Sequence, residues 1–323
     1  MSNRIAIGID IGGTNTVYGF IDTSGDVYHY QEIPTEGSKP IDNLIERIDS
    51  GVNNFLINNP ELDLCGIGIG APNGNHFTGI IQDPPNLSWG NINIVSIFKE
   101  RFQCHVQLTN DANAAALGEK YFGIAKNMDD FIVITLGTGL GSGIFSGGSL
   151  LYGHDGFAGE MGHISIDHQG RRCNCGNNGC LESYASASGI KKTIHELLQI
   201  EPDDELLNRI NNEKIDGKIL DTAFDNGNKT AQKIYEYTGE KLGQGLALAA
   251  TLLSPEAFIF YGGFSNAGSR ILIPAKKSMD RNLINEHSET IRLLQSDLPQ
   301  GQAGILGAAS LVLDLEENNY RVT

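Results

Sequence analysis

The stretch RIAIGIDIGGTNTVYGFID, residues 4–22, reads as two short strands joined by a glycine turn, and FIVITLGTGLGSGIFSGG, residues 131–148, repeats that pattern. In both turns the glycines let backbone N–H groups approach phosphate oxygens, and threonine hydroxyls can donate further hydrogen bonds. An ordinary glycine hairpin explains either turn alone about equally well. Two such hairpins at matching positions in two halves of one chain favour phosphate binding, and they are the layout expected of an actin-like ATPase core.

Neither turn matches the better-known phosphate motifs. A Walker A loop requires a Lys-Ser/Thr ending before a helix, and neither turn has one. The run GTGLGSG differs from a dinucleotide fingerprint in its spacing, and a strand follows it instead of a helix. Asp10, which opens the first turn, can hold a magnesium ion through water.

The remaining chain alternates predicted strands with predicted helices. Apolar residues at helical spacing over 41–56 predict an amphipathic helix, and LCGIGIGAP, residues 64–72, predicts a buried strand. HVQLTNDANAAALGEKYFG predicts a strand that runs into a helix at Asn110 and Asp111, where an aspartate suits the helix N-cap. The alternation predicts an α/β protein with mixed sheets.

The two hairpins predict two related domains with an actin-like ATPase (ribonuclease H-like) fold and the nucleotide in the interdomain cleft. No Pro- or Ser-rich linker separates the halves, so the boundary is expected near residue 110. We expect a smaller domain of residues 1–110, completed by a C-terminal helix at about 304–316. Residues 111–303 form the larger domain in this prediction.

Bulk composition narrows the class of partner. The 323 residues carry a net charge of −16, which disfavours binding to nucleic acid or to an anionic membrane surface. The apolar runs are too short to span a bilayer, and the N-terminus has no signal-peptide layout. We therefore expect a cytoplasmic protein whose thiols stay reduced.

Three of the five cysteines crowd into GEMGHISIDHQGRRCNCGNNGCLESYAS, residues 159–186. Cys173, Cys175 and Cys180, together with His163 upstream, offer the ligand set of a closed tetrahedral zinc site. Cys-x-Cys is too close in sequence for an easy mutual disulfide, and there is no Cys-x-x-Cys redox motif. Three inert buried thiols are the alternative. The segment predicts structural zinc.

Five motifs together resemble the ROK family of sugar kinases and repressors: DIGGTN, NDANAAALGE, LGTGLGSG, GEMGH and RRCNCGNNGCLE. They occur in order from about residue 5 to about residue 310. The continuation CLESYASASGI is more similar to the family's bacterial glucokinases than to its N-acetylhexosamine kinases. The family's repressors carry an N-terminal helix-turn-helix, for which this chain has no room before Ile5.

The resemblance implies an ATP- and Mg²⁺-dependent hexose kinase that makes glucose 6-phosphate. Asp111 is then the general base at the 6-hydroxyl, and it need only be ionised, since that hydroxyl becomes acidic mainly as its bond to phosphorus forms. In the family the histidine and three cysteines bind zinc. His163 would thus use one ring nitrogen for zinc and the other for a sugar hydroxyl.

The resemblance carries sugar binding onto seven positions: Gly74, Asn75, Asn110, Asp111, Glu160, His163 and Glu182. The two turns and a later glycine pair are expected to bind ATP through Asp10, Gly12, Gly13, Thr14, Asn15, Gly137, Thr138, Gly139, Gly262 and Gly263. A homodimer or homotetramer is also implied by the resemblance.

Two departures from the family pattern leave alternatives open. The substrate loop APNGNHFTG, residues 71–79, differs from the usual family loop and leaves the hydroxyl preference open. Tyr261 replaces a small residue and can reshape the adenine pocket. The alternatives are a ROK kinase for fructose, mannose or an N-acetylated hexosamine, and a non-catalytic sugar-sensing regulator. The sequence also leaves open whether polyphosphate or ADP serves as the donor in place of ATP.

Overall fold

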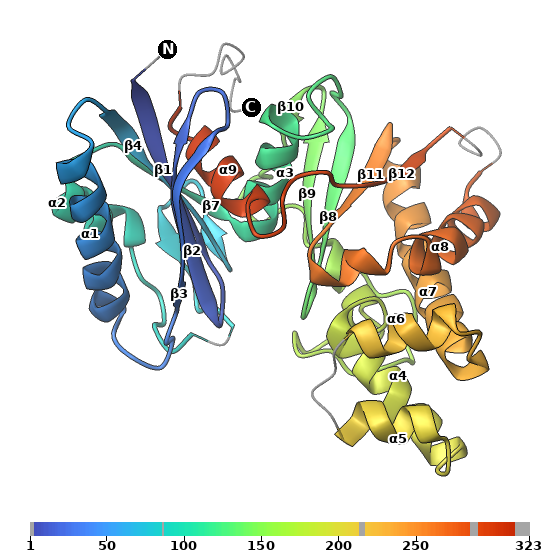
Figure 1. Ribbon diagram of the computed structural model, residues 1–323. Helices are drawn as coiled ribbons and strands as arrows, with labels where there is room; N and C mark the ends of the chain where they lie inside the picture. Colours follow the sequence, from blue (N-terminus) through green and yellow to red (C-terminus); the bar gives the residue numbers. More distant parts are fainter. Residues whose placement is uncertain (1–2, 86, 213–216, 285–289, 314–323) are drawn as a thin grey trace. The chain divides into compact units, whose positions relative to one another are not determined.

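The computed structural model describes residues 3–85, 87–212, 217–284 and 290–313. Its core is two five-stranded mixed sheets with helices packed on them (Figure 1). The predicted α/β class with mixed sheets is confirmed. None of the described helices combines the length and the apolar composition needed to cross a bilayer.

The first sheet has the strand order β3-β2-β1-β4-β7. Its first three strands form an antiparallel meander, in which Ile9 lies opposite Tyr18, and β4 and β7 extend the sheet in parallel. The strands are β1 (Arg4–Ile11), β2 (Asn15–Asp22), β3 (Val27–Pro34), β4 (Asp63–Ala71) and β7 (Val106–Asn110).

Isoleucine alternates with glycine in β4, and with Ala6, Gly8 and Asp10 in β1, and this alternation explains how both faces of the sheet are covered. The isoleucines point to a core shared with helices α1 (Ile41–Asn58) and α2 (Ile94–Phe102). The glycines point to helix α9 (Ala303–Ser310), which packs on the opposite face. A Cβ at Gly8 would lie 1.9 Å from the carbonyl oxygen of Ile305, so only glycine lets α9 come this close.

The second sheet has the order β10-β9-β8-β11-β12, which repeats the plan of the first. Strand β11 pairs in parallel with both β8 and β12, and β10 pairs antiparallel with β9. The predicted strand-turn-strand units are thus present in both sheets. The strands are β8 (Phe131–Leu136), β9 (Leu140–Ser146), β10 (Ser149–Leu150), β11 (Ala257–Tyr261) and β12 (Arg292–Gln295).

The other elements are mostly helical. Helices α7 and α8 pack against each other along their length. The helices are α3 (Asp111–Tyr121), α4 (Ala187–Ile200), α5 (Glu205–Asn212), α6 (Gly217–Asp225), α7 (Lys229–Leu253) and α8 (Ser269–Asn282). Short elements are the ribbon β5 (Gly74–Asn75) with β6 (Ile80–Ile81) and the 3-10 turns η1 (Met161–His163), η2 (Leu181–Ser183) and η3 (Gly263–Ala267).

Contacts divide the chain into two compact units. Unit 1 comprises Met1–Asp129, Gly143–Gly159 and Ser296–Thr323, and unit 2 comprises Asp130–Ser142 and Glu160–Gln295. The boundary predicted near residue 110 falls inside unit 1, because α3 packs against α9 and the strands of the first sheet. Asp111 therefore belongs to unit 1, as does α9, the helix expected at about 304–316.

Candidate active site

The β1–β2 turn of unit 1 is fixed by bonds within the hairpin and from the chain after β3. The Gly12 N–H donates to the Asn15 carbonyl at 2.9 Å. Thr35 donates its hydroxyl to the Gly12 carbonyl at 2.7 Å and its N–H to the Thr14 carbonyl at 2.8 Å. Gly13, Thr14 and Asn15 stay exposed at the tip of the turn. Four of the predicted ATP-binding residues thus share one rigid and accessible turn.

Two carboxylates of unit 1 lie close enough to repel each other. Burial raises the pKa of Asp10, near the end of β1, to about 7, and the charge of Asp111 contributes to that rise. Burial also raises the pKa of Asp111, although its surface remains open to water. A pair of carboxylates that resist ionising together is the donor set a hard cation such as Mg²⁺ prefers, because the cation offsets both charges.

Helix α3 begins differently from the sequence-based expectation. Asn110, not Asp111, is the N-cap: its side-chain oxygen accepts a hydrogen bond from the Ala112 N–H at 2.9 Å. Asp111 is the first residue of the helix, and its own carboxylate also accepts from the Ala112 N–H at 2.9 Å. The helix N-terminus therefore stabilises an ionised Asp111, while the amide NH₂ of Asn110 has no partner among the described residues.

The predicted sugar-loop residues Gly74 and Asn75 form the short strand β5 and are both buried. The amide of Asn75 donates to the Asp155 carbonyl at 2.6 Å. Its oxygen accepts from the N–H groups of Phe77 at 3.0 Å and Thr78 at 3.1 Å. Since a side-chain amide has two N–H donors, at most one remains for a ligand. These hydrogen bonds link the loop of residues 71–79 to Asp155 through the side chain of Asn75.

The β8–β9 turn of unit 2 is held by the start of helix α4. The Ala187 N–H donates to the Gly137 carbonyl at 3.1 Å, and the Ser188 N–H donates to the Thr138 carbonyl at 3.2 Å. Ser186, the N-cap of α4, bonds the Gly189 N–H at 3.0 Å. The turn and the helix start are therefore one hydrogen-bonded assembly.

A pocket of about 290 Å³ in unit 2 opens beside this turn. Gly137, Thr138 and Gly263 line one part of it, next to Gly262, whose φ of +104° suits glycine. Its walls are largely apolar, with Asp221 and Tyr235 as polar exceptions, and they comprise Ala187, Ile190, Ile194, Ile210, Leu220, Phe264 and Ala267. An apolar slot next to a glycine turn has the character of a nucleoside site.

The expected influence of Tyr261 on this pocket is not seen. Tyr261 ends strand β11 and is not among the described residues that line the pocket. Phe264, three residues later in η3, supplies the aromatic wall instead. The change of direction between β11 and η3, at Gly262, brings Phe264 to the pocket.

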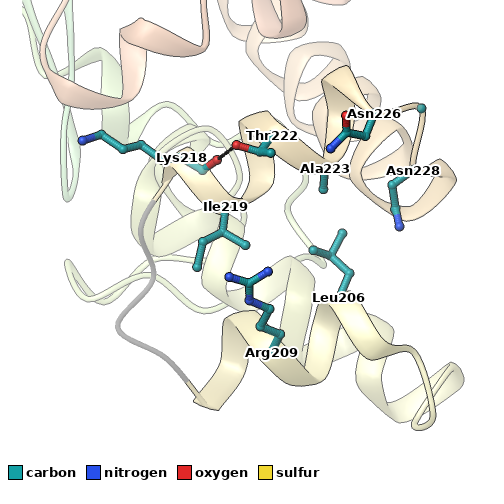
Figure 2. Close-up of a pocket in the computed structure, with 9 residues that line it drawn as sticks. Leu206, Arg209, Lys218, Ile219, Thr222, Ala223, Asn226 and Asn228 are labelled. Carbon is teal, nitrogen blue, oxygen red and sulfur yellow. Dashed lines mark hydrogen bonds between the residues drawn. The ribbon is translucent and has the colours of Figure 1, made fainter.

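A larger pocket of about 570 Å³ lies on the other side of α6, between α5, α6 and the turn before α7 (Figure 2). Leu206, Ile219 and Arg209 line it, and the side chain of Lys218 points away from them. None of the predicted site residues lines it. Of these two pockets, only the smaller one is lined by predicted ATP-binding residues, namely Gly137, Thr138 and Gly263.

The cysteine segment brings four metal-binding atoms together in unit 2. The ligand atoms of His163, Cys173, Cys175 and Cys180 all lie within 4.8 Å of one another. Cys173 Sγ lies 3.7 Å from His163 Nδ1, and Cys175 Sγ lies 3.6 Å from Cys180 Sγ. A zinc tetrahedron with bonds of about 2.3 Å has edges of about 3.8 Å. The donor set thus fits zinc in both chemistry and spacing, and the cysteines are free thiols rather than disulfides.

The two ring nitrogens of His163 face different groups. Nδ1 faces the cysteines, and Nε2 lies 3.9 Å from a carboxylate oxygen of Glu160. Both residues are about half exposed or somewhat less, at the 3-10 turn η1. An imidazole fixed on one side in this way presents its other nitrogen in a set direction.

Arg171 is a structural residue that sequence reasoning missed. Its guanidinium bonds Glu196 at 2.6 and 2.8 Å, and it bonds the carbonyls of Ser183 at 2.9 Å and Gly189 at 3.1 Å. It also lies 4.6 Å from the ring centre of Tyr184. These contacts join the cysteine segment to α4. The only signal in the sequence was its place two residues before Cys173.

Comparison with known proteins shows the family to which the chain belongs. The model of the ROK family matches residues 6–315. The chain belongs to the ROK family. It is 33% identical to a glucokinase of Halalkalibacterium halodurans over 98% of each chain, and 31% identical to the xylose repressor of Bacillus subtilis over 96% of this chain and 77% of the repressor.

Among solved structures, the chain is similar to a ROK family glucokinase from Streptomyces griseus in complex with glucose and AMPPNP. The two are 34% identical, the match covers 95% of this chain and 99% of that one, and the TM-score is 0.81. The predicted actin-like fold is thereby confirmed.

Proposed function

We propose that this protein is an ATP-dependent glucokinase that phosphorylates the 6-hydroxyl of glucose. The observation that carries the proposal is the apolar pocket beside the Gly137–Gly139 turn, in a chain similar over nearly its whole length to glucokinases. Relatives of similar length are named glucokinases, and one of them was solved with glucose and an ATP analogue.

The chemistry assigns a role to each group. Asp111 accepts the proton of the sugar hydroxyl as that oxygen forms its bond to the γ-phosphorus of ATP and the bond from phosphorus to ADP breaks. The exposed tip of the β1–β2 turn and the N–H groups around Thr138 bind phosphate oxygens. Magnesium held near Asp10 would offset the phosphate charge. In this proposal the sugar is bound by Asn110, Glu160, His163 and Glu182, with Gly74 and Asn75 shaping the loop.

Two measurements test the enzymatic proposal. ADP release should be measured with glucose, fructose, mannose and N-acetylglucosamine, each with ATP and Mg²⁺, and glucose should give the highest kcat/KM. Asp111→Asn should lower kcat by about 10²–10⁴, whereas Asp63→Asn, a matched change of an exposed aspartate in the same unit, should not lower it. A kcat equal to that of the wild type in Asp111→Asn would remove Asp111 as the base. A higher kcat/KM with another hexose would change the assigned substrate.

We also propose that His163, Cys173, Cys175 and Cys180 hold a structural zinc ion. Two of the distances between their ligand atoms are below 4 Å and all lie within 4.8 Å, which supports this. Metal analysis of the purified protein should find one zinc per chain, and Cys173→Ser should reduce it below one half. A preparation that is folded, active and free of zinc would contradict the proposal.

A sugar-sensing regulator without turnover is the second candidate, because xylose repressors are also among the relatives. It predicts glucose binding by calorimetry with no ADP release from zinc-loaded protein. A cytoplasmic location and a homodimer or homotetramer stay predictions, and light scattering of the purified protein tests the latter.

A further inference from the structure

The β8–β9 turn is held by a carboxylate from a distant part of the chain. Glu182 Oε2 accepts a hydrogen bond from the Leu140 N–H at 3.0 Å. A Cβ at Gly139 would lie 2.3 Å from the same oxygen, so a glycine is needed for this approach. A charged acceptor on a backbone N–H is a stronger bond than a neutral one. The turn therefore depends on where Glu182 lies.

Glu182 is itself fixed by the cysteine segment. It lies in η2, whose N-cap is Cys180, and the Ser183 N–H donates to the Cys180 carbonyl at 2.9 Å. Ser186 donates its hydroxyl to the Glu182 carbonyl at 2.7 Å. These two hydrogen bonds fix the backbone at Glu182, so the position of its carboxylate relative to the turn is also fixed.

The histidine end of the cysteine cluster reaches the same turn. A Cβ at Gly162, next to His163, would lie 2.1 Å from the Leu140 carbonyl oxygen. Close by, the Met161 N–H donates to the Ser142 hydroxyl at 3.4 Å. Residues at both ends of the cysteine cluster thus contact Leu140: Glu182 contacts its N–H, and Gly162 lies against its carbonyl oxygen.

The second oxygen of Glu182 is available to a ligand. Oε1 has no hydrogen-bond partner within the described ranges, whereas Oε2 is used by the turn. We propose that Glu182 is a positioning residue for the nucleotide turn as well as a sugar ligand, and that its single carboxylate couples sugar binding to ATP binding. The inference rests on the proposed glucokinase function and names the group that links its two substrates.

Sugar binding and nucleotide binding are coupled in this proposal because both depend on the side chain of Glu182. A sugar hydroxyl on Oε1 restricts the rotation of the carboxylate and so favours the orientation in which Oε2 holds Leu140. The sugar should then tighten nucleotide binding, and by thermodynamic linkage the nucleotide should tighten sugar binding by the same factor. A group that only bound sugar would leave nucleotide affinity unchanged when no sugar is present.

The test compares Glu182→Gln with Glu182→Met. Both side chains have about the same length, but only Gln keeps an oxygen that can accept from the Leu140 N–H. Mg²⁺-AMPPNP affinity is measured by calorimetry without sugar. We expect Glu182→Gln to bind within about twofold of the wild type and Glu182→Met to bind about tenfold more weakly. Glu236→Gln, on the exposed face of α7, is the matched control and should match the wild type.

Two further readouts do not depend on turnover. Hydrogen exchange at the Leu140 amide should be at least about tenfold faster in Glu182→Met than in Glu182→Gln. Glucose should lower the AMPPNP dissociation constant of the wild type and have no effect on that of Glu182→Met. If Glu182→Met fails to fold, Glu182→Asp makes the same comparison, because its shorter chain withdraws the carboxylate from Leu140.

The outcomes separate the inference from the function on which it rests. Equal AMPPNP affinity and equal Leu140 exchange in the Gln and Met variants overturn the inference and leave the glucokinase proposal standing. A wild-type protein that binds no AMPPNP overturns both. Weaker nucleotide binding in the Met variant, restored in the Gln variant, supports the inference.

Discussion

Replacing Asp10 by asparagine should stabilise the metal-free protein at alkaline pH. Burial and the charge of Asp111 raise the pKa of Asp10 from 3.8 to about 7. A shift of about 3 units corresponds to about 4 kcal/mol at most. Asp10 is partly exposed, and asparagine keeps a polar group in place, so we expect a gain of about 1–3 kcal/mol at pH 8.

The sign of the pH dependence follows from the raised pKa. Below about pH 4 the carboxyl is protonated in both the folded and the unfolded chain. Between pH 4 and 7 the unfolded chain releases the proton that the folded chain keeps, so the free energy of unfolding falls as pH rises. Above pH 7 the loss is complete. The advantage of Asp10→Asn should therefore be less than half as large at pH 5 as at pH 8.

The single tryptophan makes a fluorescence assay of unfolding specific for unit 1, which contains Asp10. Trp89 lies in unit 1 with Asp10, and its ring N–H bonds the Lys39 carbonyl at 3.0 Å. Urea unfolding followed by tryptophan fluorescence, without added divalent metal, reports on this unit. Added Mg²⁺ should stabilise the wild type more than Asp10→Asn. Asp63→Asn serves as the control at an exposed position.

One result would refute the reasoning. If Asp10→Asn and the wild type unfold at the same urea concentration at both pH 8 and pH 5, ionised Asp10 carries no folding penalty. The carboxylate pair would then be solvated, and a raised pKa would no longer support a cation at this position.

Three further predictions concern the other parts of the site. Asp111→Asn should lower kcat by about 10²–10⁴ and leave Mg²⁺-AMPPNP affinity within about threefold in calorimetry; a parallel loss of both would indicate a folding defect instead. Arg171→Met removes the guanidinium bonds to the Ser183 and Gly189 carbonyls and to Glu196, and it should lower the unfolding free energy of unit 2 by about 2–4 kcal/mol in circular dichroism; an unchanged midpoint would show that these bonds contribute nothing. Removing metal with a chelator should speed amide exchange over residues 137–140 and leave residues 12–15 unchanged; equal effects on both turns would contradict a local role for the metal.

The two hairpins could be predicted because their evidence is local. Each consists of two apolar strands separated by a glycine turn, so its pairing is local, and the structure pairs Ile9 with Tyr18 in the first hairpin. The boundary between the two units was harder to predict from the sequence. It depends on α9 returning from the far end of the chain to pack against α3, and no local pattern reveals that contact.

Residue roles were harder to predict where backbone atoms are the partners. Asn110 and Asp111 are both good caps, and only the backbone conformation decides that Asn110 takes that place. The bond from Glu182 to the Leu140 N–H is equally hidden, since a backbone N–H is present at every position except proline. The role of Arg171 was hard to predict for the same reason, because two of its hydrogen-bond partners are backbone carbonyls.

The two phosphate turns look alike in sequence but are supported in different ways. In unit 1 the long strand β3 runs beside the hairpin, and Thr35, directly after it, bonds the turn at Gly12. In the second sheet the matching strand β10 has only two residues, which is too short to supply such a group. Glu182 and the start of α4 take over that support, and in the chain they directly follow the cysteine cluster. The segment proposed to bind zinc thus holds one turn, while ordinary sheet structure holds the other. This difference is why metal removal should separate two turns that the sequence presents as equivalent.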